Sequence, residues 1–121
     1  MNRVTHFEIP ATNPEVVAAF YTELFGWKIS SWDGPVDYWI VDTGNDGPGI
    51  HGGILRRQHP EQPVVNTVQV ADLDASMAKV AAAGGQIVVP KMPIPTVGWL
   101  CYAKDPDGNI FGIMQNDPAA K

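Results

Sequence analysis

The sequence predicts an α+β domain that consists of two copies of one strand–helix–strands module. Patterns typical of a strand, a helix and further strands occur twice in that order, and glycine and proline separate the segments. A single shift of 59 positions also brings the helix caps and turn glycines of the first half onto those of the second. The length of 121 residues fits one domain better than two.

The first module begins with a strand and a helix. Between Val4 and Ile9 one alternating set of residues is largely apolar and the other is mixed, which is typical of a strand. Asn13 can cap a helix, and Pro14 suits its first position because the N–H that proline lacks would be unpaired there. Apolar residues then recur at helical spacing up to Gly26, which can take the left-handed conformation that ends a helix. Three short strands are predicted to follow, at residues 27–30, 38–42 and 51–57.

The second module is predicted from the shift. With this shift, Asn13 corresponds to Asp72, which can cap a second helix, and Gly26 corresponds to Gly85, where the second helix is expected to end. Matched residues continue through the last strand: Gly49 and Gly108, Gly53 and Gly112, Ile54 and Ile113, Leu55 and Met114. The alternative is that two similar segments share only common turn residues. We expect one domain at residues 1–121, with module one at about 1–58, a linker at 58–63, module two at about 60–117 and a loose tail.

The composition excludes several classes of function. A net charge of −5 and a pI near 4.9 argue against nucleic acid or an anionic membrane as a partner, since both need a basic surface. No secretory signal and no membrane-spanning segment is recognisable. Cys101 is the single cysteine, so no internal disulfide can form, and a reducing compartment is expected. We therefore expect a cytoplasmic protein.

Three segments carry a resemblance to a known family. They are residues 6–9 together with 20–29 (HFEI and FYTELFGWKI), residues 70–75 (VADLDA) and residues 105–112 (DPDGNIFG). In this order they resemble the vicinal oxygen chelate superfamily of glyoxalases, bleomycin-resistance proteins and extradiol dioxygenases. The resemblance implies two βαβββ modules that form a curved mixed sheet around a cavity, usually in a homodimer.

The resemblance also implies a divalent metal, held by His, Glu or Gln at four strand positions. These positions correspond here to His6, Gly53, Val65 and Gly112, of which only His6 carries a donor atom. Because a stable site needs several converging donors, we expect no metal of the usual kind. The alternative is a substitute site made of His6, His51 and Glu8.

The face of each strand that carries these positions is predicted to line the cavity, because residues two apart in a strand point to the same side. The glycines would leave space for a ligand there. Trp39 or Ile40 and Trp99 or Leu100 are candidates for the apolar part of the lining. The full set of expected ligand-binding residues is His6, Glu8, His51, Gly53, Thr67, Gln69, Trp99, Gly112 and Met114.

Three functions are compatible with this pattern. The first is a homodimer that binds a small, partly aromatic organic molecule without metal, as the bleomycin-resistance branch of the family does. The second is a lyase or isomerase of the glyoxalase type, in which a metal bound by His6 and non-standard ligands polarises the substrate. The third is a protein-interaction subunit with a vestigial pocket. The number of donors favours the first, and no catalytic residue is assigned.

Overall fold

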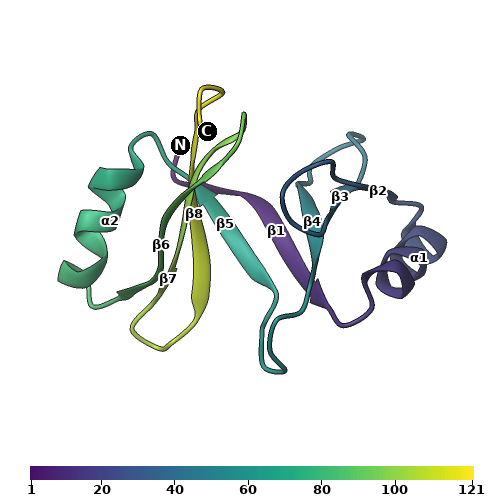
Figure 1. The fold of residues 1–121 in the computed structure, drawn as a ribbon, viewed down its shortest axis with the longest axis horizontal. Helices are drawn as coiled ribbons and strands as arrows, with labels where there is room; N and C mark the ends of the chain where they lie inside the picture. The colour runs from purple at the N-terminus through teal and green to yellow at the C-terminus, as the bar shows by residue number, and fades with distance from the viewer. The chain divides into compact units, whose positions relative to one another are not determined.

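The structure is a computed structural model that describes residues 1–121. Each half of the chain contains a strand, a helix and three strands (Figure 1). The elements are β1 (Arg3–Ala11), α1 (Pro14–Phe25), β2 (Lys28–Ser31), β3 (Tyr38–Asp42), β4 (His51–Arg56), β5 (Val65–Gln69), α2 (Leu73–Ala82), β6 (Gln86–Ile94), β7 (Gly98–Lys104) and β8 (Ile110–Asn116). The predicted α+β class with two βαβββ modules is therefore confirmed.

The chain forms two compact units. The first unit is His6–Val64, and the second unit is Val65–Lys121 together with Met1–Thr5. In the first unit the strand order is β2-β3-β4-β1, with β1 parallel to β4 and the other neighbours antiparallel. In the second unit it is β5-β8-β7-β6, with β5 parallel to β8 and the others antiparallel.

The shift of 59 positions holds in the strand register. Glu8 is paired with Gly53 in the first unit, and Thr67 is paired with Gly112 in the second. Because paired residues of neighbouring strands point to the same side, corresponding side chains lie on corresponding faces. The repeat thus extends from the turn residues to the hydrogen-bonded strand pairs.

Three of the four helix ends lie where the sequence predicts them. The side chains of Asn13 and Asp72 accept hydrogen bonds from the first turns of α1 and α2. Gly26 has a φ of 73° and ends α1, as expected. The expected end of α2 at Gly85 is wrong: the helix stops at Ala82, and the left-handed residue is Gly84, with a φ of 97°. Gly85 instead packs tightly, since a Cβ there would lie 2.5 Å from the carbonyl oxygen of Lys104.

Each helix packs on one face of the sheet of its own unit. Ala11, Val41 and Ile54 form the core beneath α1, and Val70, Leu73, Cys101 and Ile113 form the core at α2. Burial raises the pKa of the Cys101 thiol, so this cysteine is a packing residue and a poor nucleophile. We call the opposite side of each sheet its helix-free face.

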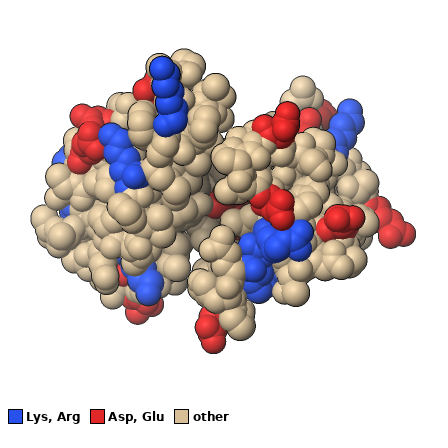
Figure 2. Space-filling model, in the orientation of Figure 1, with Lys and Arg blue, Asp and Glu red and all other residues tan.

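Charged groups are dispersed on the surface. Figure 2 shows acidic and basic side chains interspersed with uncharged residues over the face in view. This face has no continuous basic surface of the kind that binds nucleic acid. Neither α1 nor α2 is long and apolar enough to cross a membrane.

Candidate functional site

The helix-free face of the first sheet brings together all four candidate residues of the first unit. His6 pairs with His51 and Glu8 pairs with Gly53 across the parallel strands β1 and β4. Glu8 is 8% exposed, which is unusual for a carboxylate. On the neighbouring strand β3, Tyr38 lies on the same face, since the strand pairing sets Ile40 opposite Gly53.

A hydrogen bond between His6 and Tyr38 is the central feature of this face. The Nε2 atom of His6 lies 2.6 Å from the Tyr38 hydroxyl, and the two rings are nearly parallel, with an interplanar angle of 13°. The edge of Trp32 packs against Tyr38 at a centroid distance of 6.0 Å. The site therefore pairs an imidazole with a phenol that its neighbours hold in place.

The surroundings of His6 favour the neutral form of its imidazole. Burial lowers the pKa of His6 because it disfavours the charged form, the Glu8 carboxylate opposes this shift, and His51 adds to it. A neutral imidazole beside a phenol can both donate and accept hydrogen bonds. This pair is suited to a ligand that carries a carbonyl or hydroxyl group.

Gly53 lets Tyr38 reach His6. A Cβ at Gly53 would overlap the ring and hydroxyl of Tyr38, so the phenol occupies the space that the glycine leaves. Gly112 has the same role in the second unit, where a Cβ would lie 2.7 Å from the Thr67 hydroxyl oxygen. The space beside both glycines is therefore filled by the chain itself, which corrects the expectation that it is open to a ligand.

His51 lies at the edge of the site and is turned toward a loop. Its Nδ1 accepts a hydrogen bond from the Thr43 backbone N–H at 3.2 Å and lies 3.5 Å from an Asp42 carboxylate oxygen. The His51 side chain is 54% exposed, so its contact with Asp42 contributes little to stability. Its electrostatic effect on His6 is to lower the pKa of that imidazole.

In the second unit, four of the five candidate residues share the helix-free face. Thr67 pairs with Gly112 and Gln69 pairs with Met114. Trp99 lies on the opposite face, where it packs against the core at α2 and donates a hydrogen bond from Nε1 to Asp117 at 3.0 Å. Of the two possibilities Trp99 and Leu100, the strand pairing places Leu100 beside Met114.

The important residue that the sequence did not reveal is Tyr38. Strand alternation puts it on the same side as Ile40, and this was the available signal. Its contact with His6 depends on the absence of a side chain at Gly53, which lies far from it in the sequence. Similarly, Tyr102 lies opposite Gly112 and shares the helix-free face of the second sheet.

Comparison with protein families identifies the chain. The family model of the Glyoxalase/Bleomycin resistance protein/Dioxygenase superfamily matches residues 3–113. The chain belongs to this superfamily. The glyoxalase-like resemblance predicted from the sequence is therefore confirmed.

Two curated proteins are similar to this chain in sequence. They are the CFP32 proteins of Mycobacterium bovis and Mycobacterium tuberculosis, which have the word glyoxylase in their name. Each is 32% identical over 115 residues, which cover 92% of this chain and 43% of the relative. The chain thus spans less than half of the length of these relatives.

Solved structures share the fold at low sequence identity. Methylmalonyl-CoA epimerase from Mycobacterium tuberculosis has a TM-score of 0.72 at 13% identity, covering 95% of this chain and 88% of that one. A hypothetical protein from Bacillus halodurans has a TM-score of 0.72 at 14% identity, with 98% and 97% covered. A Streptomyces coelicolor methylmalonyl-CoA epimerase in complex with 2-nitronate-propionyl-CoA has a TM-score of 0.71 at 14% identity, with 100% and 99% covered.

The donor set does not fit the metal site that membership of the superfamily implies. Of the four expected ligand positions, Gly53, Val65 and Gly112 carry no donor atom, and the Nε2 of His6 is hydrogen-bonded to Tyr38. No group of three or more His, Cys, Asp or Glu side chains is arranged to hold a metal ion. The substitute set of His6, His51 and Glu8 is therefore not arranged as a metal site either. The polar groups that this face presents include the His6 imidazole and the Tyr38 phenol.

Proposed function

We propose that this protein binds a small organic molecule on the helix-free face of its first sheet, without a resident divalent ion. The hydrogen-bonded pair of neutral His6 and Tyr38 carries this proposal. A hydrogen-bonding pair beside apolar side chains is typical of a small-molecule site, in which a few polar groups orient the ligand.

The neighbouring side chains suggest the chemistry of the ligand. Ile40 is 43% exposed and lies opposite Gly53 on this face, with Leu55 two residues further along β4. Tyr38 is paired with Leu55 across the strands, and the Trp32 ring packs against Tyr38. These groups favour an aromatic or apolar molecule with one carbonyl or hydroxyl group, which would hydrogen-bond to the His6–Tyr38 pair.

A fragment screen by NMR tests this proposal. Small aromatic ketones and phenols are expected to shift the backbone amide signals of His6, Tyr38 and Gly53. The His6→Ala variant should weaken the best fragment about tenfold, since it removes a hydrogen bond at a desolvated site. The matched control is His59→Ala, which removes a histidine from the exposed linker. Fragments that bind His6→Ala as tightly as the control variant would refute the proposed site.

The second candidate is a lyase or isomerase of the glyoxalase type that uses a metal. It retains the family position of His6, but it needs additional donors. Elemental analysis of the purified protein separates the two functions. Stoichiometric metal that is lost in His6→Ala would support the enzyme, and its absence in both proteins would support the binding function.

We also propose that the protein acts as a single-domain homodimer in the cytoplasm. Val16, Phe20 and Leu24 form an apolar stripe on α1, at intervals of four residues, and are 62%, 57% and 56% exposed. The relatives contain more than twice the matched length in one chain, and a second copy would supply a comparable length here. Light scattering should give a dimer at micromolar concentration. Phe20→Lys should shift it to a monomer, whereas the control Val36→Lys, equally exposed but outside α1, should not.

A further inference from the structure

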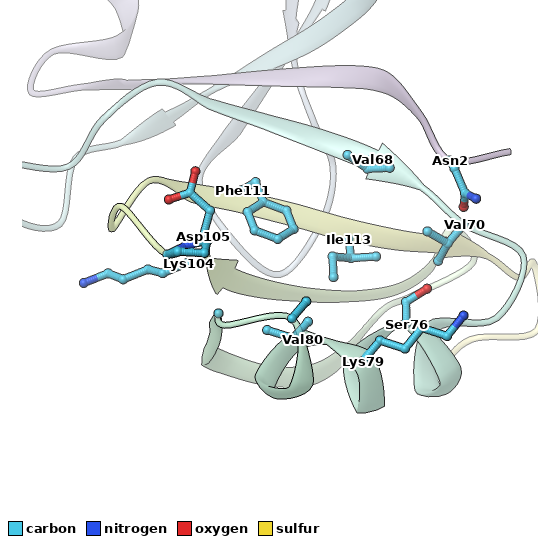
Figure 3. Close-up of a pocket in the computed structure, with 13 residues that line it drawn as sticks. Asn2, Val68, Val70, Ser76, Lys79, Val80, Lys104, Asp105, Phe111 and Ile113 are labelled. Atoms are coloured by element: carbon cyan, nitrogen blue, oxygen red, sulfur yellow. The ribbon is translucent and has the colours of Figure 1, made fainter.

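A cavity lies on the side of the second sheet that faces α2. It occupies about 380 Å³ between α2 and the strands β5 and β8 (Figure 3). Val68, Phe111 and Ile113 line it from the sheet, and Val80 and Ala83 line it from the helical segment. Val68 and Ile113 are paired neighbours on the face that packs against α2, so this cavity is separate from the helix-free faces.

The sequence of α2 explains why the cavity is not filled. Ser76, Lys79, Val80 and Ala83 follow one another at helical spacing along the side of α2 that lines it. Ser76 and Ala83 have short side chains, and only Val80 extends a branched apolar group from this side. The helix makes its main contacts with β6, β7 and β8, which leaves the side toward β5 uncovered. An apolar groove results whose walls belong to regular elements.

The two ends of the groove are polar. In Figure 3 the Ser76 hydroxyl and the Lys79 amine lie toward one end, on the same side as Asn2, and Lys104 and Asp105 lie toward the other. Neither Lys79 nor Lys104 forms an ion pair within the chain. The lining therefore carries two cations that have no intramolecular partner.

Asp105 is the one carboxylate of the lining, and its oxygens accept hydrogen bonds within a turn. Asp105 accepts hydrogen bonds from the backbone N–H groups of Asp107 and Asn109 and from the Asn109 side chain, each within 3.0 Å. These bonds lower the pKa of Asp105 and keep its oxygens directed at the turn. The charge of the groove available to a ligand is thus positive, and it complements an anion.

We propose that this groove binds a small amphiphilic carboxylate, with an apolar chain between α2 and the sheet and the carboxylate at Lys79 and Ser76. The volume lies within the range of about 300–1,000 Å³ typical of small-molecule sites. Valine, phenylalanine and isoleucine side chains offer an unbranched apolar chain the burial that drives its binding. A lysine amine and a serine hydroxyl can each donate a hydrogen bond to a carboxylate.

Calorimetric titration with decanoate tests the site, with NMR to locate it. Saturable binding is expected, with shifts of the backbone amides of Val68, Val80 and Phe111 and none at His6 or Gly53. Lys79→Met keeps the length of the side chain and removes its charge, so it should weaken decanoate binding about tenfold. Decanol, which lacks the charge, should bind wild type and Lys79→Met alike.

Two controls make the outcome decisive. Lys28→Met removes an exposed lysine of the first unit and should leave decanoate binding unchanged. Ala83→Phe places a ring in the groove and should abolish binding of both decanoate and decanol. The proposal is overturned if Lys79→Met and Lys28→Met bind decanoate with the same affinity. It is also overturned if the amide signals that decanoate shifts belong to the first unit. Failure of decanoate to bind also overturns the proposal. If Ala83→Phe then converts a dimer to a monomer, a second copy of the chain covers the groove instead.

Discussion

Replacing Gly53 with alanine should disrupt the His6–Tyr38 pair without removing either side chain. The added methyl group would overlap the Tyr38 ring and hydroxyl. Ordinary carbon–carbon contact is about 3.5 Å, so the ring would have to move by more than about 1 Å. The hydroxyl would then leave the Nε2 atom of His6, which now lies 2.6 Å away.

Three contributions set the size of the effect. Overpacking costs about 1–3 kcal/mol, and the low end applies here because Tyr38 is only partly buried. Loss of the hydrogen bond with His6 costs about 1 kcal/mol more. Replacement of a glycine returns about 0.5 kcal/mol, because it restricts the unfolded chain. We therefore expect the free energy of unfolding to fall by about 1.5 kcal/mol, and Tm to fall by about 6 °C.

Urea unfolding and a double-mutant cycle measure this effect. Gly49→Ala is the matched control, since no atom lies within 4 Å of a Cβ at that position. In a Tyr38→Ala background the clash is absent, and Gly53→Ala should change the free energy of unfolding by less than about 0.5 kcal/mol. If Gly53→Ala is as harmless as Gly49→Ala in the wild-type background, the explanation for this glycine is wrong.

The remaining predictions concern protonation, metal and Trp99. Because the pKa of His6 is lowered in the folded state, the unfolded state binds more protons, and the free energy of unfolding should fall as pH decreases from 7 through the folded pKa. His6→Gln should show a shallower pH dependence in urea unfolding at pH 5 to 7, and an unchanged slope would contradict this. Zn²⁺ or Ni²⁺ should raise Tm little, since one histidine at the family positions binds an ion weakly; a stabilisation of several degrees that His6→Ala abolishes would show that other ligands exist. Trp99→Phe loses its hydrogen bond to Asp117 and should cost about 1 kcal/mol of stability, while fragment binding at the first sheet should not change.

The fold could be predicted because local signals agreed with one another. Helix caps at Asn13 and Asp72 and the glycine that ends α1 all use backbone chemistry that is readable within a few residues. Strand alternation also grouped His6 with Glu8 correctly, because the two residues lie in one continuous strand. The end of α2 was missed because two adjacent glycines could each take the left-handed conformation, and tight packing at Gly85 decides between them.

The candidate site was harder to predict because it depends on register between strands. Alternation shows that Trp99 and Leu100 face opposite sides, but which of them accompanies Met114 is set by the pairing of β7 with β8. Tyr38 poses a further difficulty. Its contact with His6 is a side-chain arrangement made possible by Gly53, and no pattern within one segment encodes it.

Met1–Thr5 belong to the second unit, although the whole first unit separates them from Val65 in the sequence. The Asn2 backbone N–H donates a hydrogen bond to the carbonyl oxygen of Gln69, the last residue of β5, at 2.7 Å. The second unit thus combines Met1–Thr5 with Val65–Lys121, two segments that are far apart in the sequence (Figure 1). A circular permutant that joins Lys121 to Met1 and opens in the linker at residues 58–63 would make each unit almost continuous in sequence. Cutting the gene at the same linker would instead leave the second unit without its first five residues.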